Sequence, residues 1–179
     1  VRYCLSVNDN KGRSTTAVGA QGEHNFSFYN NTIVNCGEFQ FKNLYNSYIA
    51  NNIIVPQDGA TFAYDVDPKR GNVFENNCYY KVMTPIVDLG AKNTVPGFAG
   101  TDYSDVNSFK LSADSPLIGA GSEVGVEKDF YGNPVQSNNI GCYGGTGVDT
   151  EYKGENINKK IIRTILDIIE TVKHEIYVI

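Results

Sequence analysis

Two short segments carry polar and charged side chains at alternating positions, and these side chains are the first candidates for chemistry. Residues 38–42 read Glu-Phe-Gln-Phe-Lys, and residues 61–67 read Thr-Phe-Ala-Tyr-Asp-Val-Asp. Because alternate side chains of a strand point to opposite faces, the polar members of each segment share one face. On that face Lys42 is a candidate base for proton abstraction, and Asp65 with Asp67 is a candidate calcium site, since calcium prefers carboxylate oxygens.

These residue types suit the β-elimination of a uronic-acid polysaccharide. A base must remove the proton beside the sugar carboxylate, and a cation must neutralise the charge that develops there. Lys42 would be the base, the two aspartates would hold calcium, and Glu38 would add a third oxygen. The alternative is a solvated strand face with charges paired between neighbouring strands, because alternation alone places polar residues there. Arg2 and Asp9 are a second, weaker candidate pair.

Hydrolysis of a glycosidic bond is the rival chemistry for the same face. It needs two carboxyl groups roughly 5 to 10 Å apart. Glu38 and Asp65 have the right residue types, although nothing in the sequence selects this pair over others. A nucleophilic triad is not supported, since His24 and His174 lie near no serine or cysteine motif. If the chain is an enzyme, we therefore expect elimination before hydrolysis.

The cysteines do not form a metal-binding motif. No two of them have the CxxC spacing of a zinc site, and none has the CxxH spacing. We expect free, buried thiols, with a single disulfide as the alternative in a secreted protein. The four residues are Cys4, Cys36, Cys78 and Cys142.

Composition and charge exclude several classes of partner. Of the 179 residues, 41% are hydrophobic, so a folded core is expected rather than disorder. A formal net charge of −5 disfavours nucleic acid, whose phosphates need concentrated lysine and arginine. No run of 18 apolar residues occurs, so no membrane span is predicted. The chain opens on Val1 rather than Met, and we interpret it as a mature chain or an excised fragment.

An Asn-Asn pair recurs and defines an internal repeat. Residues 28–34, 49–55 and 74–80 each contain an apolar residue, a variable residue, Asn-Asn and an apolar run. A fourth copy fits 27 residues upstream, with Cys4 in place of the second asparagine. A strand-rich repeat of this length, without helical periodicity, indicates a β-solenoid. The second asparagines, spaced by 21 and 25 residues, are Asn31, Asn52 and Asn77.

In a solenoid the Asn-Asn pair has two physical roles. Asparagine tolerates the left-handed backbone conformation that a sharp bend requires. Its amide can also hydrogen-bond to the asparagine one coil away, in an internal ladder that satisfies buried polar groups. We therefore prefer a structural role for these asparagines over ligand binding, and Cys4 would weaken only the first rung.

Further strand-like segments lie between the Asn-Asn bends. Residues 38–42 and 61–67 alternate, and residues 16–20 are a weaker equivalent one coil earlier. Each coil thus contains three strands, joined by loops of variable length. We predict an all-β fold in which residues 1–92 form about four coils of a right-handed parallel β-helix.

Three later segments carry a family resemblance. Residues 111–121 read Leu-Ser-Ala-Asp-Ser-Pro-Leu-Ile-Gly-Ala-Gly, residues 128–134 read Lys-Asp-Phe-Tyr-Gly-Asn-Pro, and residues 139–145 read Asn-Ile-Gly-Cys-Tyr-Gly-Gly. Together with the asparagine ladder and residues 1–9, they resemble the C-terminal part of right-handed β-helix proteins of the pectate-lyase-like superfamily. The resemblance covers roughly residues 1–145, and it is specific for the fold rather than for a reaction.

The resemblance implies where a ligand would bind. In this superfamily, sugar lies along a groove on the strand face one strand before the asparagine bend. It also implies an acidic polysaccharide as partner and an extracellular or periplasmic location. The net charge favours calcium as cofactor, since an acidic groove otherwise repels an acidic polymer. The substrate-binding candidates on and beside this face are Glu38, Gln40, Lys69 and Arg70.

The reaction stays open, because this fold serves lyases, hydrolases, adhesins and structural stalks alike. A lyase acting on uronic-acid polymers is the first expectation if the chain is catalytic. A non-catalytic carbohydrate-binding or structural module is the alternative, since a fragment of about four coils would lack the catalytic ones. A glycoside hydrolase is the second alternative.

The repeat ends after residue 92. Residues 93–147 contain many turn motifs and are predicted to form a loop-rich cap that closes the β-helix. Residues 148–179 are predicted to contain an amphipathic helix, because apolar residues recur every three or four positions from residue 157 to residue 176. We expect this helix to cover the core or to mediate self-association, with a membrane-surface helix or the start of another domain as alternatives.

Overall fold

The computed structural model describes residues 1–10, 16–64, 67–82 and 87–150. Within this part of the chain, Val1–Asp149 belong to one compact unit. The amphipathic helix predicted within residues 148–179 lies, from residue 151 onward, outside the described residues and stays a prediction. The same holds for Asp65.

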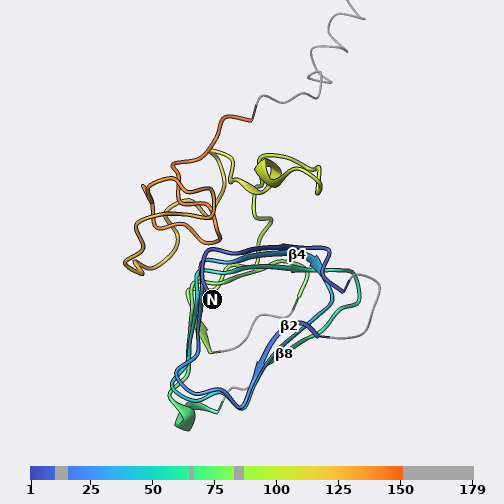
Figure 1. Ribbon diagram of the computed structural model, residues 1–179, viewed down its shortest axis with the longest axis vertical. Helices are drawn as coiled ribbons and strands as arrows, with labels where there is room; N and C mark the ends of the chain where they lie inside the picture. The colour runs from blue at the N-terminus through green and yellow to red at the C-terminus, as the bar shows by residue number, and fades with distance from the viewer. Residues whose placement is uncertain (11–15, 65–66, 83–86, 151–179) are drawn as a thin grey trace, which may run out of the picture. The chain divides into compact units, whose positions relative to one another are not determined.

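Three parallel sheets stack short strands from successive turns of the chain along the sides of a triangle (Figure 1). In spatial order, sheet A contains β3 (Ser27–Tyr29), β6 (Tyr48–Ala50), β9 (Val73–Glu75) and β11 (Asp88–Leu89). Sheet B contains β1 (Leu5–Val7), β4 (Thr32–Cys36), β7 (Ile53–Pro56) and β10 (Cys78–Tyr79). Sheet C contains β2 (Thr16–Gln21), β5 (Glu38–Lys42) and β8 (Phe62–Tyr64).

Each coil passes through sheets C, A and B in that order, so the predicted all-β parallel solenoid with three strands per coil is confirmed. The only helical elements among the described residues are two short 3-10 turns. They are η1 (Pro68–Arg70) and η2 (Val106–Phe109).

Strand alternation sorts the side chains of sheet C between core and solvent. Phe39 and Phe41 are fully buried, as the alternation predicts. Phe41 packs against Phe28 with ring centroids 5.3 Å apart, and Phe39 meets Phe62 edge-on at 6.2 Å. Such offset and edge-to-face pairs are favourable, so a column of aromatic rings fills the coils. The half-exposed residues of the same strand are Glu38, Gln40 and Lys42.

The second asparagines of the Asn-Asn pairs form a ladder inside the coils. The side-chain Nδ2 and the backbone N–H of Asn31 both donate to Asn52 Oδ1, at 2.9 and 3.0 Å. Asn52 repeats this pattern toward Asn77 Oδ1, at 2.8 and 2.9 Å. In the first coil, the backbone N–H of Cys4 donates to Asn31 Oδ1 at 3.0 Å. The predicted ladder is therefore confirmed, with Cys4 at its first rung.

The first asparagines of the pairs have a separate role. Asn30, Asn51 and Asn76 have φ angles of 52°, 55° and 53°, in the left-handed region that asparagine tolerates. Asn30 Nδ2 donates to the backbone oxygen of Asn139 at 2.9 Å, and Asn51 Nδ2 donates to that of Ser122 at 2.8 Å. These outer asparagines therefore attach the segment that follows the coils.

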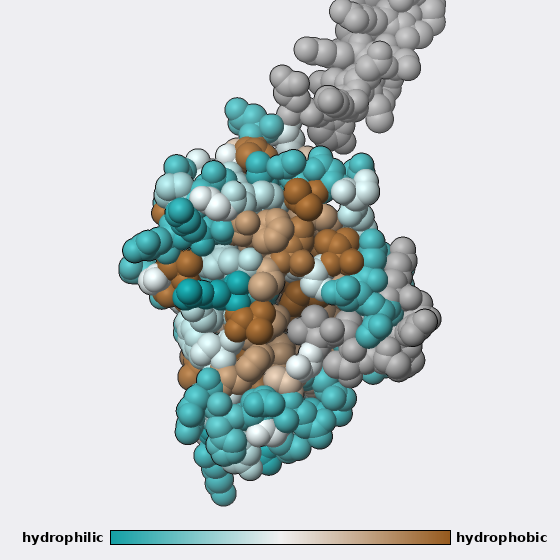
Figure 2. Space-filling model, in the orientation of Figure 1, coloured by the Kyte–Doolittle hydropathy of each residue, from teal (hydrophilic) through white to brown (hydrophobic). Residues whose placement is uncertain are grey.

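Strands β4, β7 and β10 of sheet B are largely buried on both faces, because parts of the segment 96–148 cover the outer face of the sheet. Gly141 approaches so closely that a Cβ atom there would lie 2.5 Å from Ile53 Cδ1. Strands covered on both faces are apolar throughout, and all four residues of β7 are buried. Figure 2 looks onto one end of the coils, where apolar side chains gather in the middle, while the corner that carries η1 is polar. The fully buried residues that pack on the outer face of sheet B include Leu111, Leu117 and Ile140.

A buried carboxyl group lies at the other end of the ladder. Asn77 Nδ2 donates to Asp88 Oδ2 at 2.7 Å, and the Tyr79 hydroxyl donates to the same oxygen at 2.6 Å. Asp88 Oδ1 is buried and has no hydrogen-bond partner in the described part of the chain. Burial raises the pKa of the Asp88 carboxyl above its ordinary value, although the two hydrogen bonds oppose this shift.

Candidate functional site

The outer face of sheet C carries a central row of Gly19, Gln40 and Ala63 between two polar rows. Because β5 pairs with β2 and β8, Gln40 lies between Gly19 and Ala63. Glycine has no side chain and alanine only a methyl group, so Gln40 is the one large side chain of these three. The row therefore forms a strip that runs across the strands, along the solenoid axis.

Charged residues flank this central row on both sides. On one side of it, Lys42 lies beside Gln21 of the neighbouring strand. On the other side, Glu38 lies beside Thr61, the residue that precedes β8. Glu38 and Lys42 are four residues apart on one strand, which separates their Cα atoms by about 13 Å. The two charges thus lie on opposite sides of this strip instead of converging on one atom. The Lys42 ammonium makes no ion pair with any residue that the structure describes.

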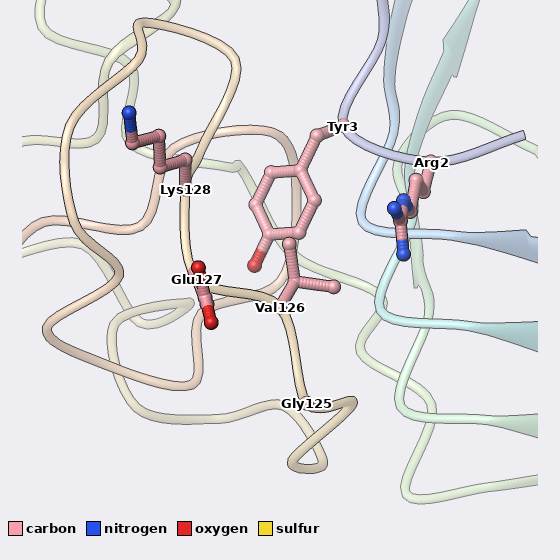
Figure 3. A pocket seen from close by; sticks show the side chains of 6 residues that line it. All are labelled: Arg2, Tyr3, Gly125, Val126, Glu127 and Lys128. Carbon is pink, nitrogen blue, oxygen red and sulfur yellow. The ribbon is translucent and has the colours of Figure 1, made fainter.

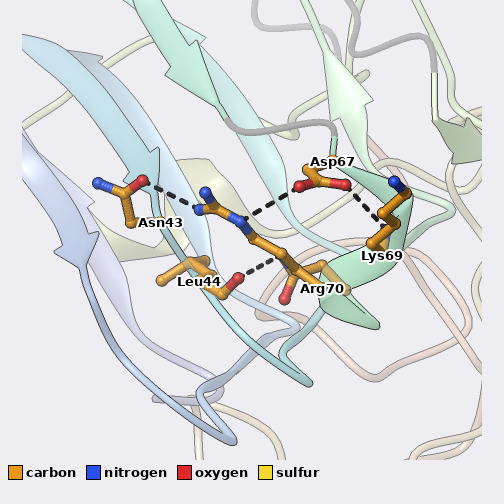
Figure 4. Close-up of polar contacts among 6 residues, drawn as sticks. Asn43, Leu44, Asp67, Lys69 and Arg70 are labelled. Carbon is orange, nitrogen blue, oxygen red and sulfur yellow. Dashed lines mark hydrogen bonds and ion pairs between the residues drawn. The ribbon is translucent and has the colours of Figure 1, made fainter.

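The other two predicted substrate-binding residues lie in η1, at the corner between sheets C and A (Figure 4). Arg70 Nε lies 3.5 Å from Asp67 Oδ2, and Arg70 Nη1 donates to Asn43 Oδ1 at 3.0 Å. The guanidinium carbon also lies 5.0 Å from the centre of the Tyr45 ring. Arg70 is therefore held by protein partners, whereas the Lys69 side chain is exposed.

Asp67 was predicted to bind calcium together with Asp65. Its Oδ1 accepts from the backbone N–H of Lys69 at 3.0 Å, and its Oδ2 pairs with Arg70. A calcium ion bound at Asp67 would compete with Arg70 for the same carboxylate. Among the residues described, no three His, Cys, Asp or Glu side chains gather closely enough to bind a metal ion. Because Asp65 lies outside them, the calcium site stays a prediction.

A column of stacked planar groups beside sheet C was not predicted. The rings of His24 and Tyr45 stack with centroids 4.6 Å apart and an interplanar angle of 8°, and Arg70 continues the column. These three residues are spaced by 21 and 25 positions, as the ladder asparagines are. The shared spacing could have predicted this column from the sequence. Each of its members directly precedes a residue with a left-handed backbone. Those residues are Asn25, Asn46 and Gly71.

Two adjoining cavities open between the first coil and residues 125–128. The first, of about 430 Å³, is lined by charged and aromatic side chains that include Arg2, Tyr3 and Lys128 (Figure 3). The second, of about 340 Å³, shares Tyr3 with it. Arg2 and Asp9, the weaker candidate pair, have separate partners: Arg2 donates to the Tyr29 hydroxyl, and Asp9 accepts from the Ser6 hydroxyl. The other residues that line the first cavity are Gly125, Val126 and Glu127.

No protein-family model matches the chain, and no curated protein matches it either. The pectate-lyase-like motifs therefore stay a resemblance, while the parallel solenoid and its ladder rest on the structure itself. Within the described residues, no helix is both long enough and apolar enough to cross a membrane.

Proposed function

We propose that the outer face of sheet C binds an acidic polysaccharide whose chain lies along the solenoid axis. The central row of Gly19, Gln40 and Ala63, with Lys42 and Glu38 on either side of it, carries this proposal. An extended polymer suits such a strip, because its hydroxyl groups would hydrogen-bond to Gln40 and its flanking residues. Lys42 would offer a positive charge to a sugar carboxylate, and charge-assisted hydrogen bonds of this kind are strong.

The resemblance to pectate-lyase-like proteins supports the same face. It implies a right-handed coil, sugar bound on this sheet, and a secreted protein of the extracellular or periplasmic space. Lys69 would provide a second cation at the corner of the strip, where its side chain is exposed. Arg70 would act mainly by holding the corner, through its contacts with Asn43 and Tyr45.

A lyase is the second candidate, because the Lys42 side chain makes no ion pair within the described residues and, as the neutral amine, would have a lone pair to accept the proton. Calcium held by Asp65 and Asp67 would neutralise the sugar carboxylate. The contact between Asp67 and Arg70 opposes that ion, so the geometry favours binding without turnover. Hydrolysis has less support, because Glu38 is the one carboxylate on the described outer face of this sheet.

Affinity electrophoresis in gels that contain polygalacturonate tests the proposal. We expect Lys42→Ala to weaken binding about ten-fold, equivalent to about 1.4 kcal/mol. Lys92→Ala is the matched control, since Lys92 is a half-exposed lysine outside sheet C, and we expect unchanged binding. No binding to acidic polysaccharide, or equal loss in both variants, would contradict the proposal. Calcium-dependent growth of absorbance from unsaturated sugar ends, abolished by Lys42→Ala, would establish the lyase.

A further inference from the structure

Residues 88–92, the terminal coil, are attached to the solenoid by few contacts. Their strand β11 has two residues and lies at the edge of sheet A, where it pairs with β9 alone. The Leu89 side chain is 77% exposed, so its burial adds little to this pairing. Further backbone hydrogen bonds to the preceding coil run from Asn76 N–H to Leu89 O, from Lys92 N–H to Asn77 O and from Tyr79 N–H to Lys92 O, at 2.8–2.9 Å. Because weakly attached segments open locally before the whole protein unfolds, the terminal coil is suited to open by itself.

Asp88 joins the terminal coil to the end of the asparagine ladder. Asn77 Nδ2 donates to Asp88 Oδ2 at 2.7 Å, as Asn52 Nδ2 donates to Asn77 Oδ1 at 2.8 Å one coil earlier. The Tyr79 hydroxyl donates to the same Asp88 oxygen at 2.6 Å. A carboxyl group thus holds the acceptor position that asparagine amides hold in earlier coils. Because an amide is neutral and a carboxyl group can ionise, the charge of this rung depends on pH.

The surroundings of Asp88 favour its neutral form. Its Oδ1 is buried and has no hydrogen-bond partner, and its carboxyl group makes no ion pair, among the residues that the structure describes. Burial, with a smaller contribution from the Glu75 charge, raises the pKa of Asp88, although its two hydrogen bonds oppose the shift. Tyr79 stays a donor, because burial and the neighbouring carboxyl group raise the pKa of its phenol. The titratable groups packed around Asp88 are therefore Tyr79 of β10 and Glu75 of β9, with Tyr64 of β8 close to Tyr79.

We propose that Asp88 acts as a pH-dependent latch on the terminal coil. While its carboxyl group is neutral, the coil stays paired with β9 and β10. When the group ionises, water must reach both carboxylate oxygens to stabilise the charge, and residues 88–92 leave the ladder. The open state frees the backbone N–H groups of Asn76 and Tyr79, and an unpaired strand edge of this kind can pair with another strand.

The direction of the pH effect follows from the same contacts. The pKa of Asp88 is raised in the closed coil, and it returns toward the ordinary aspartate value of about 4 when the coil opens. The closed coil therefore keeps its full stability below that value and loses it as the pH rises through the raised pKa. Each unit between the two pKa values increases the ratio of open to closed coil about ten-fold.

Hydrogen exchange of the isotope-labelled full chain, measured by NMR between about pH 4 and pH 8, tests the proposal. The informative amides are those of Asn76, Tyr79 and Lys92, and the reference amide is that of Cys78, which donates to Asn52 O at 2.7 Å. We expect the first three to exchange through a local opening that low concentrations of urea do not change, whereas Cys78 exchanges by urea-sensitive unfolding. Their protection factors should fall about ten-fold or more over this pH range. Protection equal to that of Cys78, or protection that does not change with pH, would overturn the proposal.

Three variants assign the pH effect to Asp88. Asp88→Asn removes the charge and keeps an acceptor oxygen, so the protection of the three amides should change less than about two-fold over the same pH range. Asp58→Asn is the matched control, since the Asp58 side chain is exposed, and it should keep the wild-type pH dependence. Tyr79→Phe removes a donor that favours the ionised form, so the fall in protection with pH should become larger. A wild-type pH dependence in Asp88→Asn, or an unchanged or smaller one in Tyr79→Phe, would contradict the latch.

Discussion

Asn52→Ala measures how strongly the inner ladder stabilises the solenoid. Asn52 is fully buried and makes four side-chain hydrogen bonds. Its Oδ1 accepts from the backbone N–H and the side chain of Asn31, at 3.0 and 2.9 Å. Its Nδ2 donates to Asn77 Oδ1 at 2.8 Å and to the backbone oxygen of Phe28 at 2.9 Å. No water can replace these partners without entering the core.

The expected loss follows from these contacts. The variant removes the acceptor of the buried Asn31 backbone N–H, and a buried polar group without a partner costs about 1–3 kcal/mol. The two hydrogen bonds donated by Asn52 Nδ2 contribute about 1 kcal/mol each. We therefore expect the free energy of unfolding to fall by about 4 kcal/mol, which is large for a single substitution.

Urea titration followed by circular dichroism measures this loss. We expect the midpoint to fall by more than about 1 M with an unchanged slope, since slopes are about 1–3 kcal/mol per molar urea. Asn93→Ala is the control, because Asn93 is exposed, and its change should stay within about 0.5 kcal/mol. A loss below about 1 kcal/mol for Asn52→Ala would refute a stabilising role for the ladder.

Three further predictions use the same stability assay. Asp88→Asn keeps an acceptor oxygen and removes a buried charge. Because burial raises the folded pKa of Asp88, the wild type loses stability as pH rises from the ordinary aspartate pKa of about 4 through the folded pKa, and the variant should become more stable relative to it over that range. Gly141→Ala should cost more than about 2 kcal/mol, since its φ is 102° and its Cβ would lie 2.5 Å from Ile53 Cδ1. A double-mutant cycle on Arg70→Ala and Tyr45→Ala should give a coupling of about 0.5–1 kcal/mol, as exposed cation–π pairs do.

Each of these predictions has a contrary outcome. A stability difference between wild type and Asp88→Asn that does not change with pH would mean that the carboxyl titrates normally in the folded protein. Full stability of Gly141→Ala would mean that the segment after the coils does not contact sheet B so closely. Additive effects in the cycle would mean that the guanidinium and the ring do not interact in solution.

Two sequence periodicities are sufficient to predict the coils. Alternation over residues 38–42 assigns Phe39 and Phe41 to the core, and the same pattern gives Gln40 and its polar neighbours a common outer face. The recurring Asn-Asn pair assigns Asn52 to a ladder. Both inferences succeed because they depend only on neighbours within one or two coils.

The features that the sequence did not predict depend on contacts between distant segments. Asn30 hydrogen-bonds to Asn139, 109 residues away, and no local pattern links the two. The apolar run Ile53–Pro56 was an available sign that this strand is covered on both faces. At the candidate site, the pairing of Asp67 with Arg70 depends on the turn geometry of η1, which residue types alone do not specify.

The position of a bound polysaccharide tests the central claim most directly. The isotope-labelled full chain would be titrated with oligogalacturonate, and the amide shifts would be mapped along the sequence. We predict that the largest saturable shifts fall on Gly19, Gln40 and Ala63, the central row of sheet C, and that Lys42→Ala weakens them. Absence of binding, or shifts that leave this row unchanged, would contradict the claim that the outer face of sheet C is the polysaccharide site.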